Sequence, residues 1–403
     1  MPIRIVKVHI AFESMLLNSS QVSSIRPILS PLLHSLTSSP SLERDGHPSD
    51  PEMVYLTTGA SGGVQLLMSV LISSPFVGIA IPIPQYPLYS ATLSLHDAKP
   101  VRYDLNSSDD WSLNVAQLGE NVDAARKEGT DVRAVVVINP GNPTGSCLTH
   151  DNIQDLIRLA HEKKLVILAD EVYQANIYTK DRPFVSFKKV LRDFATTGKT
   201  DAEKRIAEEV ELVSFHSISK GFTGECGRRG GYFELTNIDS DVESQIYKMA
   251  SVSLCPSIQG QIGVDLLVRP PKQGEPSFEL YEKESNEILR TLKERSEKMQ
   301  KKFNSLDGVE CNEAQGALYL FPQVHLPPKA HEAAKKEGRQ PDEFYCLAML
   351  DETGICVVPG SGFGMAPRDD GSIFFRTTVL AKETDEFVDR YEKFHKQFTQ
   401  QYA

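Results

Sequence analysis

Residues 209–230 read Glu-Val-Glu-Leu-Val-Ser-Phe-His-Ser-Ile-Ser-Lys-Gly-Phe-Thr-Gly-Glu-Cys-Gly-Arg-Arg-Gly, and they are the most informative stretch of the chain. The apolar and β-branched residues of its first part, 209–216, predict a strand. Lys220 follows this strand, with hydroxyl side chains before it and arginines after it. Such a lysine suits the attachment of an aldehyde cofactor. Ser-x-Ser-Lys also occurs by chance, and most lysines are solvated surface charges. Whether Lys220 binds a cofactor therefore depends on motifs elsewhere in the chain.

Helices and strands alternate in the region before this stretch. An amphipathic helix is predicted over residues 62–73, because apolar residues recur there at helical spacing. These residues are Val64, Leu67, Met68 and Leu71. Three apolar runs are predicted to be buried strands, namely 77–81, 133–138 and 165–169. A helix that Thr149 caps is expected between the last two. Short alternation of this kind indicates an α/β domain on a mainly parallel sheet.

Polar residues follow the predicted strands where each strand ends. Asn142 comes shortly after the strand at 133–138, and Asp170 directly after the strand at 165–169. Lys220 has the same relation to the strand at 209–216. Ligands of parallel α/β sheets bind beyond the carboxyl ends of the strands. We therefore expect these three side chains to converge on one ligand.

Composition narrows the class of protein. The length of 403 residues suggests two or three domains. A net charge of −11 argues against nucleic acid or an anionic membrane as the main partner. The six cysteines include no C-x-x-C pair, which fits a reducing compartment and disfavours both a disulfide framework and a zinc site. No apolar run reaches the roughly 20 residues that a membrane span needs.

The two ends of the chain differ from this centre. Residues 1–41 are a leader with a serine-rich tract and more basic than acidic residues, a composition shared with transit peptides; an irregular or wrongly delimited leader is the alternative. We expect a large domain over 42–280 and a small domain over 281–403. A charged, solvated helix over 278–306 would bridge them. The small domain would contain segments 316–321, 355–358 and 373–377 and a closing helix over 382–397.

Four separated motifs resemble those of the class I aminotransferases, the fold-type I enzymes of pyridoxal phosphate. They are Asn142-Pro-Thr-Gly145, Asp170-x-x-Tyr173, Ser217-x-Ser-Lys220 and the late arginine Arg376. The alanine aminotransferases in particular are similar in sequence to four longer segments, residues 140–145, 219–232, 359–364 and 375–378. The resemblance covers about residues 42–403. Residues before about 42 do not match.

The resemblance implies a fold and a quaternary structure. The large domain would hold a mainly parallel seven-stranded sheet, and the small C-terminal domain would be α+β. The active site of such enzymes lies at a homodimer interface. In the family, an N-terminal arm embraces the second subunit and carries a tyrosine that reaches the partner's cofactor phosphate. Residues 1–41 contain no tyrosine. We therefore expect a truncated or misdelimited chain that has low activity or activity conditional on added cofactor.

The resemblance also assigns roles around the cofactor ring. Lys220 would bond to the cofactor aldehyde and then move the substrate proton. Asp170 would accept the pyridinium N–H, although a carboxylate there is equally expected as a helix cap or turn residue. Tyr173 and Asn142 would bind the phenolic oxygen, whereas Asn-Pro-Thr-Gly alone also fits a simple β-turn. Tyr86 would stack on the ring face, with a core tyrosine as the alternative.

Other residues would hold the phosphate and the substrate. The loop after Thr58 leads into a helix, so Ala60, Ser61 and Gly62 would cradle the phosphate at its N-terminus. Ser217 would add a hydroxyl. An arginine would complete this site; the alanine enzymes favour Arg229, and the general class spacing favours Arg228.

Arg376 follows two phenylalanines on a predicted strand, where a buried charge needs a partner. The resemblance supplies the substrate α-carboxylate, and an internal ion pair is the alternative. The loop Gly360–Gly364 does not have the setting of a nucleotide-binding loop and is expected to line the substrate pocket.

The motifs together predict transamination from L-alanine to 2-oxoglutarate, giving pyruvate and L-glutamate by a ping-pong mechanism with pyridoxal phosphate and no metal. The alternatives are another class I aminotransferase or lyase, or an inactive homologue that acts as a binding protein. The expected partners are small amino and keto acids and a second copy of the chain. The expected compartment is the cytoplasm, with the mitochondrion possible.

Overall fold

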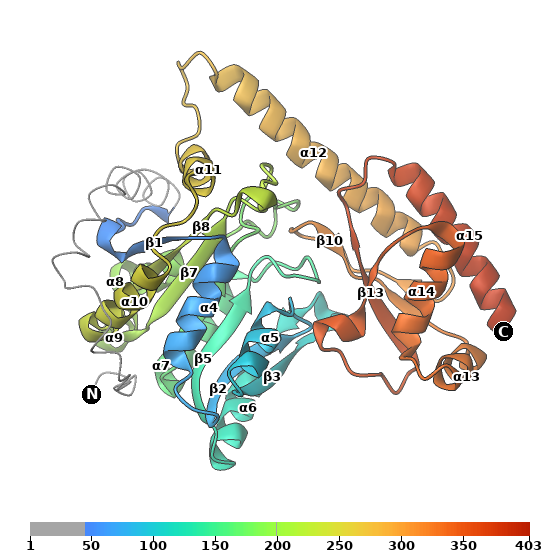
Figure 1. The fold of residues 1–403 in the computed structure, drawn as a ribbon, viewed down its shortest axis with the longest axis horizontal. Helices are drawn as coiled ribbons and strands as arrows, with labels where there is room; N and C mark the ends of the chain where they lie inside the picture. Colours follow the sequence, from blue (N-terminus) through green and yellow to red (C-terminus); the bar gives the residue numbers. More distant parts are fainter. Residues whose placement is uncertain (1–44, 199) are drawn as a thin grey trace.

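The computed structural model describes residues 45–198 and 200–403. The predictions for residues 1–41 lie outside the described residues. Figure 1 shows a large domain and a smaller C-terminal domain, with the long helix α12 (Phe278–Phe303) running between them. The expected boundary near residue 280 falls in the first turn of this helix.

An eight-stranded sheet forms the centre of the large domain. Its order is β1 (Val54–Thr57), β8 (Gly231–Thr236), β7 (Leu212–Ser217), β6 (Val166–Asp170), β5 (Asp131–Ile138), β2 (Val77–Ile83), β3 (Lys99–Asn106) and β4 (Ser112–Leu113). The five strands from β7 to β3 are mutually parallel. The remaining strands at the two edges are antiparallel to their neighbours. The predicted fold class is therefore confirmed.

The sheet has eight strands where seven were predicted. The additional strand is β4, a two-residue partner of β3. A short turn separates them, in which Asn106 caps a 3-10 turn at Ser107–Asp109 and Trp111 has a positive φ of 60°. Two residues are too short to show the alternation by which a strand is predicted.

Helices cover both faces of this sheet (Figure 1). One face carries α6 (Val115–Lys127), α7 (His150–Lys163), α8 (Phe187–Thr197) and α9 (Asp201–Glu209). The other carries α4 (Ala60–Leu71), α5 (Leu88–Leu95) and α10 (Ser240–Val252). Successive strand residues alternate between the two cores, as Ile167 and Leu168 of β6 do. Burial on both faces explains why the parallel strands are continuous apolar runs.

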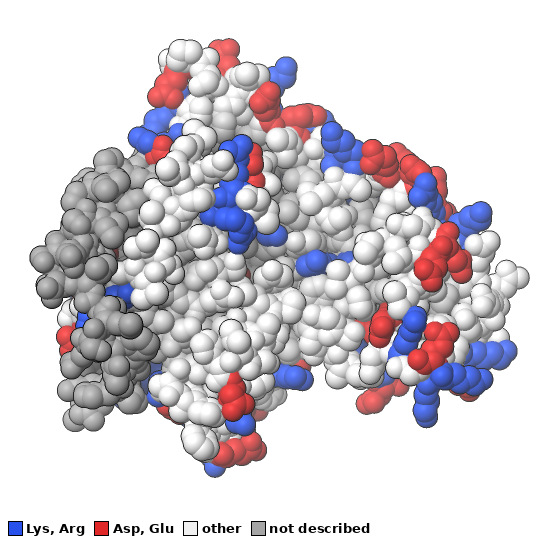
Figure 2. Space-filling model, in the orientation of Figure 1, with Lys and Arg blue, Asp and Glu red and all other residues white. Residues whose placement is uncertain are grey.

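The small domain packs helices on a second sheet. Its strands are β9 (Val309–Glu310), β10 (Tyr319–Leu320), β11 (Gln323–His325), β12 (Val358–Pro359) and β13 (Ser372–Thr378). Its helices are α13 (Pro328–Lys336), α14 (Pro341–Thr353) and α15 (Thr384–Tyr402). Leu292, Met299 and Phe303 of α12 belong to the core of this domain, whereas the charged side chains of α12 lie on the surface, as predicted. Figure 2 shows these acidic and basic side chains interspersed along α12 and α15.

Most predicted elements occur with small differences in their bounds. The strand predicted over 209–216 begins only at Leu212, because α9 continues to Glu209. The segment 316–321 contains just two strand residues, since Ala317 has a positive φ of 61° that interrupts an extended backbone. The predicted strand at 355–358 is β12, which begins at Val358.

One further helix, α11 (Ile258–Val268), lies beside β8. None of the helices in residues 45–198 and 200–403 is long and apolar enough to cross a membrane.

Candidate active site

The predicted convergence of Asn142, Asp170 and Lys220 follows from the sheet register. Ile138 at the end of β5 lies opposite Asp170 at the end of β6, and Asp170 lies opposite Phe215 near the end of β7. The three strands thus end at one edge. The positive charge of Lys220 acts on the Asp170 carboxyl across the space between them.

Lys220 is half-buried and has no acidic partner. Its Nζ donates to Tyr319 Oη at 3.4 Å and lies 5.4 Å from the centre of the Tyr173 ring. In the part of the chain that the structure describes, no carboxylate forms an ion pair with it. This environment disfavours the alternative of an ion-paired or solvated surface lysine.

Asn176 fixes the backbone on the far side of Lys220. This fully buried side chain accepts a hydrogen bond from Gly221 N at 2.9 Å and donates to Gly221 O at 3.2 Å. Gly221 has a positive φ of 72°, which glycine adopts without strain. The lysine therefore projects from a turn in which Asn176 binds both the N–H and the C=O of the following residue.

Asp170 is almost completely buried. Its Oδ2 accepts from Tyr89 Oη at 2.8 Å, and its Oδ1 accepts from Val172 N at 3.4 Å. Burial raises the pKa of the Asp170 carboxyl, while Tyr89, the Val172 amide and Lys220 oppose this effect. A carboxylate in this situation is stabilised by a cationic N–H donor.

Tyr89 is a residue that the sequence analysis missed. It lies at the start of α5, fully buried, and burial followed by the Asp170 charge raises its phenol pKa well above 10. Tyr89 therefore stays a neutral donor to Asp170. No local signal marks Tyr89, because its role depends on a contact with a carboxylate 81 residues away in the chain.

Asn142 and Tyr173 lie together, as the motifs predict. Asn142 Nδ2 donates to Tyr173 Oη at 3.3 Å, and Asn142 Oδ1 accepts from Arg376 Nη1 at 2.9 Å. Both Asn142 and Tyr173 are buried. Burial, followed by the neighbouring Tyr319, raises the pKa of the Tyr173 phenol. Tyr173 is thus a neutral hydroxyl.

Arg376 is a cation between two aromatic rings. Its guanidinium carbon lies 4.2 Å from the centre of the Tyr319 ring and 4.8 Å from that of Phe363. Within residues 45–198 and 200–403, Arg376 forms no ion pair, so the alternative of an internal acidic partner is disfavoured. Stacked rings hold the guanidinium plane without neutralising it. The site can therefore bind a carboxylate.

Tyr319 of β10 is the second residue that the sequence analysis missed. It contacts Lys220, Tyr173 and Arg376. Burial raises the pKa of its phenol, but Lys220, the Tyr173 hydroxyl and Arg376 outweigh this effect and lower the pKa below 10. The sequence marks the segment only as a core strand, because nothing local shows a contact with a lysine 99 residues away.

The start of α4 offers a site for a phosphate. No side chain caps this helix at Gly59, whose φ is +78°. A helix leaves its first N–H groups without intrahelical partners, so a phosphate can accept from them. A Cβ on Gly231 would lie 2.7 Å from Ala60 N, so glycine alone lets β8 approach this turn. Ser217 lies opposite Gly231 in the register of β7 and β8, at the same edge.

The two adjacent arginines lie in different places. Arg229 Nη2 donates to Ser61 Oγ and to Thr58 O, both at 3.1 Å, at the start of α4. Arg228 instead forms an exposed ion pair with Glu225 at 2.8 Å. The geometry therefore favours Arg229 as the phosphate ligand. The resemblance to the alanine aminotransferases favours the same arginine.

Tyr86 and the loop Gly360–Gly364 lie at the junction of the domains. Tyr86 is 43% exposed, an open aromatic face suited to stacking on a ligand. Gln85 N donates to Phe363 O at 3.1 Å, which joins the turn before α5 to the 3-10 helix at Gly360–Phe363. Since Phe363 also stacks on Arg376, this loop borders the carboxylate site.

The donor set fits pyridoxal phosphate in each of its parts. The start of α4 with Arg229 suits the phosphate, and the buried Asp170 suits a protonated ring nitrogen. Asn142 Nδ2 and Tyr173 Oη suit the phenolic oxygen, and Lys220 Nζ suits the aldehyde.

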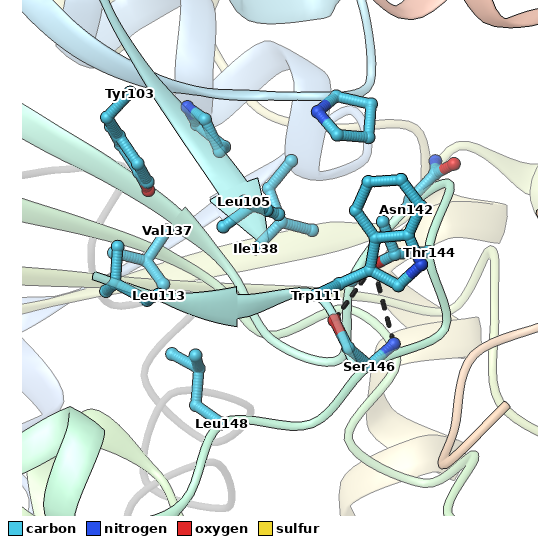
Figure 3. A pocket seen from close by; sticks show the side chains of 13 residues that line it. Tyr103, Leu105, Trp111, Leu113, Val137, Ile138, Asn142, Thr144, Ser146 and Leu148 are labelled. Carbon is cyan, nitrogen blue, oxygen red and sulfur yellow. Dashed lines mark hydrogen bonds between the residues drawn. The ribbon is translucent and has the colours of Figure 1, made fainter. Parts of the chain in front are cut away.

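A small cavity lies beside Asn142 (Figure 3). Its volume of about 20 Å³ holds roughly one water molecule. Apolar side chains including Trp111, Leu113 and Val137 line it, and Thr144 Oγ1 lies 2.8 Å from Ser146 Oγ at its polar end. The cavity is therefore too small for an amino acid. Asn142 is one of the residues that line it.

The sequence matches the family model for aminotransferase class I and II over residues 29–391. The chain belongs to this family. The family match begins inside the leader 1–41 that the sequence analysis sets apart. The resemblance stated from the motifs is confirmed, and family membership implies pyridoxal phosphate as the cofactor.

Curated members of the family are similar over most of the chain. A probable mitochondrial alanine aminotransferase of Dictyostelium discoideum is 49% identical over 89% of this chain and 66% of its own length. Glutamate–glyoxylate aminotransferase 2 of Arabidopsis thaliana is 49% identical over 89% of this chain and 73% of its own length. The chain thus spans about two thirds to three quarters of the length of these relatives.

Solved aminotransferase structures share the fold. An alanine aminotransferase from Pyrococcus furiosus superposes with a TM-score of 0.72, covering 94% of this chain and 88% of that chain at 23% identity. An aminotransferase from Escherichia coli gives 0.72 at 20% identity, with 96% and 89% covered. At these identities the likeness concerns the fold.

Proposed function

We propose that this chain is a pyridoxal-phosphate-dependent aminotransferase that moves the amino group of L-alanine to 2-oxoglutarate. The observation that carries the proposal is the pair of unneutralised cations, Lys220 and Arg376, on either side of Tyr319. A lysine for the aldehyde and an arginine for a carboxylate are what an α-amino acid and this cofactor require together. Relatives at 44 to 49% identity are named alanine aminotransferases.

The cofactor would be held by the residues described above, with Tyr86 on its ring face. When bound, pyridoxal phosphate supplies a ring that withdraws electrons from the substrate Cα. Asp170, positioned by Tyr89, would keep the ring nitrogen protonated. Ala60, Ser61, Gly62, Ser217 and Arg229 would anchor the phosphate, and Asn142 and Tyr173 the phenolic oxygen.

Lys220 would be the acid–base residue. With the cofactor bound, the Nζ of Lys220 would be the group that takes the proton from the substrate Cα and returns it during the transfer of the amino group. Alanine would leave as pyruvate, and the same lysine would run these transfers in reverse on 2-oxoglutarate. Ping-pong kinetics would follow, because pyruvate would leave before 2-oxoglutarate binds.

Arg376 would orient the substrate through its α-carboxylate. A guanidinium offers two parallel N–H donors to a carboxylate. The rings of Tyr319 and Phe363 beside it form an apolar wall that suits the methyl group of alanine. Asn142, which accepts from Arg376, would join the carboxylate site to the cofactor.

Glutamate–glyoxylate transamination is a second candidate. Two relatives with this name are 48 and 49% identical to the chain, as similar as the alanine enzymes. Both reactions pair glutamate and 2-oxoglutarate with a small amino or keto acid. A lyase reaction or an inactive binding protein are the remaining alternatives.

The test is a comparison of substrates on the purified full chain with added pyridoxal phosphate. We expect alanine to convert the visible absorbance of the bound cofactor and 2-oxoglutarate to restore it. Rates with alanine and 2-oxoglutarate should exceed those with glutamate and glyoxylate; the reverse order would establish the second candidate. Release of ammonia in the absence of a keto acid would indicate a lyase, and no spectral response would indicate a binding protein.

We also propose that the chain forms a homodimer through the α11 face, which we define as Val252, Leu254, Ile258, Ile262, Leu266 and Leu280. All six are more than half exposed, an unusual cluster for a monomer surface. The face adjoins the backbone of Arg229, because a Cβ on Gly260 of α11 would lie 2.6 Å from Arg229 O.

Sedimentation of the full chain should give a dimer, and Ile262→Glu should dissociate it. The control is Leu95→Glu, which places the same charge at an exposed leucine on α5. A monomeric parent chain, or equal effects of both variants, would contradict the dimer proposal. For the compartment, we propose the cytoplasm or the mitochondrion; relatives from Dictyostelium discoideum and Arabidopsis thaliana are named mitochondrial.

A further inference from the structure

Tyr319 closes a ring of contacts around the candidate site. Tyr173 Oη donates to Tyr319 Oη at 3.3 Å, and Lys220 Nζ donates to the same oxygen at 3.4 Å. The ring of Tyr319 lies under the Arg376 guanidinium at 4.2 Å. One side chain from the small domain thus contacts the group proposed to bind the aldehyde and the group proposed to bind the carboxylate.

The backbone before Tyr319 is fixed to the large domain. Tyr178 N donates to Gln315 O at 2.8 Å, Gly316 N to Gly145 O at 2.8 Å, and Ala317 N to Asn176 O at 3.0 Å. A Cβ on Gly316 would lie 2.5 Å from Asn176 O, so this close approach requires glycine.

Ala317 has a strained backbone in the segment 315–317 that is hydrogen-bonded to the large domain, which we call the seam. Its φ is +61°, although it is a buried non-glycine residue. A left-handed backbone is strained at a non-glycine residue and persists where the surroundings dictate it, often at functional sites. The strain therefore fits a segment whose task is to aim the tyrosine that follows two residues later.

Asn176 holds both sides of the Lys220–Tyr319 contact. Its side chain binds both the N–H and the C=O of Gly221, the residue directly after the lysine. Its backbone oxygen accepts from Ala317 N, shortly before the tyrosine. Asn176 thus fixes the backbone beside Lys220 and the backbone just before Tyr319. The distance between the Lys220 amine and the Tyr319 hydroxyl is therefore set locally, through one buried residue.

We propose that Tyr319 is a positioning residue that holds the free amine of Lys220 beside the substrate during transamination. The hydroxyl performs this task, while the ring beneath Arg376 supports carboxylate binding. Besides Tyr319, the titratable groups that face the amine are Tyr173 and Asp170. Arg376 lies over the ring of Tyr319. Only Tyr319 offers it a hydrogen bond within the described residues. The inference rests on the proposed function, since Lys220 needs to be held only when it is released and reused.

The test separates the hydroxyl from the ring. Tyr319→Phe removes the hydroxyl and keeps the ring, whereas Tyr319→Leu removes both. Tyr178→Phe is the matched control, because it removes a buried hydroxyl that bonds to Ala317 O in the same seam but does not reach Lys220. Circular dichroism and melting curves establish that each variant folds.

The first readout is independent of catalysis. In the cofactor-free full chain, the rate at which an amine-directed reagent labels Lys220 is measured by mass spectrometry at fixed pH. A net hydrogen bond changes an equilibrium roughly two- to tenfold, so we expect Tyr319→Phe to raise labelling of Lys220 by about that factor. Tyr178→Phe should leave it at the level of the parent chain. Unchanged labelling in Tyr319→Phe, or an equal rise in Tyr178→Phe, would overturn the inference.

The second readout is the division of the kinetic effect. We expect Tyr319→Phe to lower kcat by about ten- to a hundredfold with a small change in KM for alanine, because a misplaced catalytic group slows the chemical step. Tyr319→Leu should raise KM as well. An effect of Tyr319→Phe on KM alone would contradict the assignment of the hydroxyl to Lys220. If the parent chain failed to transaminate while the labelling difference persisted, the proposed function would fail and the Lys220–Tyr319 contact would stand.

Discussion

Asp170 shows at the scale of a single residue how the fold prepares a charge for a ligand. The carboxyl is buried against the end of β6, and this burial raises its pKa. Tyr89, the Val172 amide and the more distant Lys220 are the groups that oppose protonation. The Tyr89 hydroxyl is the direct side-chain donor among them, so it decides how well Asp170 can stay ionised for a ring N–H.

Replacing Tyr89 by phenylalanine should shift the acidic side of the pH–activity profile to higher pH. The variant loses the hydrogen bond that lowers the Asp170 pKa, so the carboxyl protonates at a higher pH and activity is lost earlier as the pH falls. A hydrogen bond to a charged group contributes roughly 1.5–3 kcal/mol, so we expect kcat to fall about tenfold or more below neutral pH. Tyr103→Phe, which removes a buried hydroxyl bonded to Val136 O, should leave the acid limb in place.

Arg376→Lys tests the carboxylate site. Lysine keeps the charge but loses the two-donor fork and the stacking between Tyr319 and Phe363. The loss of a two-pronged contact should reduce kcat/KM by about two to four orders of magnitude, for alanine and for 2-oxoglutarate alike. Arg368→Lys is the control, since Arg368 also stacks on a ring, that of Phe374, outside the site. Damage confined to 2-oxoglutarate would mean that Arg376 binds the distal carboxylate.

At the scale of elements, the two adjacent arginines after β7 can be compared directly, because Arg229 contacts the start of α4 and Arg228 does not. Arg229→Lys should raise the dissociation constant of pyridoxal phosphate roughly ten- to a hundredfold, because a charge-assisted bidentate contact is replaced by a point charge. Arg228→Lys changes an exposed ion pair, which contributes little, and should alter the constant less than twofold. Equilibrium titration of the cofactor measures both. The opposite ranking would support the general class spacing.

The sequence predicts the elements whose signals are local. The buried strands around β5 and β6, the cap at Thr149 and the loops carrying Asn142 and Lys220 each depend on neighbours in the chain, and they occur where the patterns indicate. Tyr319 and Tyr89 were missed because their roles arise from contacts across the sheet edge and between domains. A tyrosine within an apolar run is indistinguishable from a core residue until its hydroxyl has a partner.

At the scale of the whole molecule, the small domain contributes a pH-dependent term to stability. His395 of α15 is buried, with Nε2 hydrogen-bonded to Asp307 O at 2.9 Å and Nδ1 hydrogen-bonded to Tyr345 Oη at 2.9 Å. Burial lowers its pKa, opposed by Asp307. The unfolded chain therefore takes up a proton first as the pH falls.

This histidine should make the fold less stable in acid. Its contribution is complete above the unfolded pKa of about 6.5 and declines below it, by at most about 1.4 kcal/mol for each pH unit. We expect His395→Asn to be less stable at pH 7.5 but to show a smaller further drop in melting temperature between pH 7.5 and 5.5. A drop equal to that of the parent chain would show that other groups dominate acid unfolding.

The central claim is that Lys220 binds the cofactor. Reduction of the full chain with borohydride in the presence of pyridoxal phosphate, followed by peptide mapping, tests it most directly, with Lys220→Ala as the control. We predict a phosphopyridoxyl group on the peptide that contains Lys220, and no modification at another lysine when Lys220 is replaced. A modification at any other lysine of the parent chain, or none at all, would contradict the account.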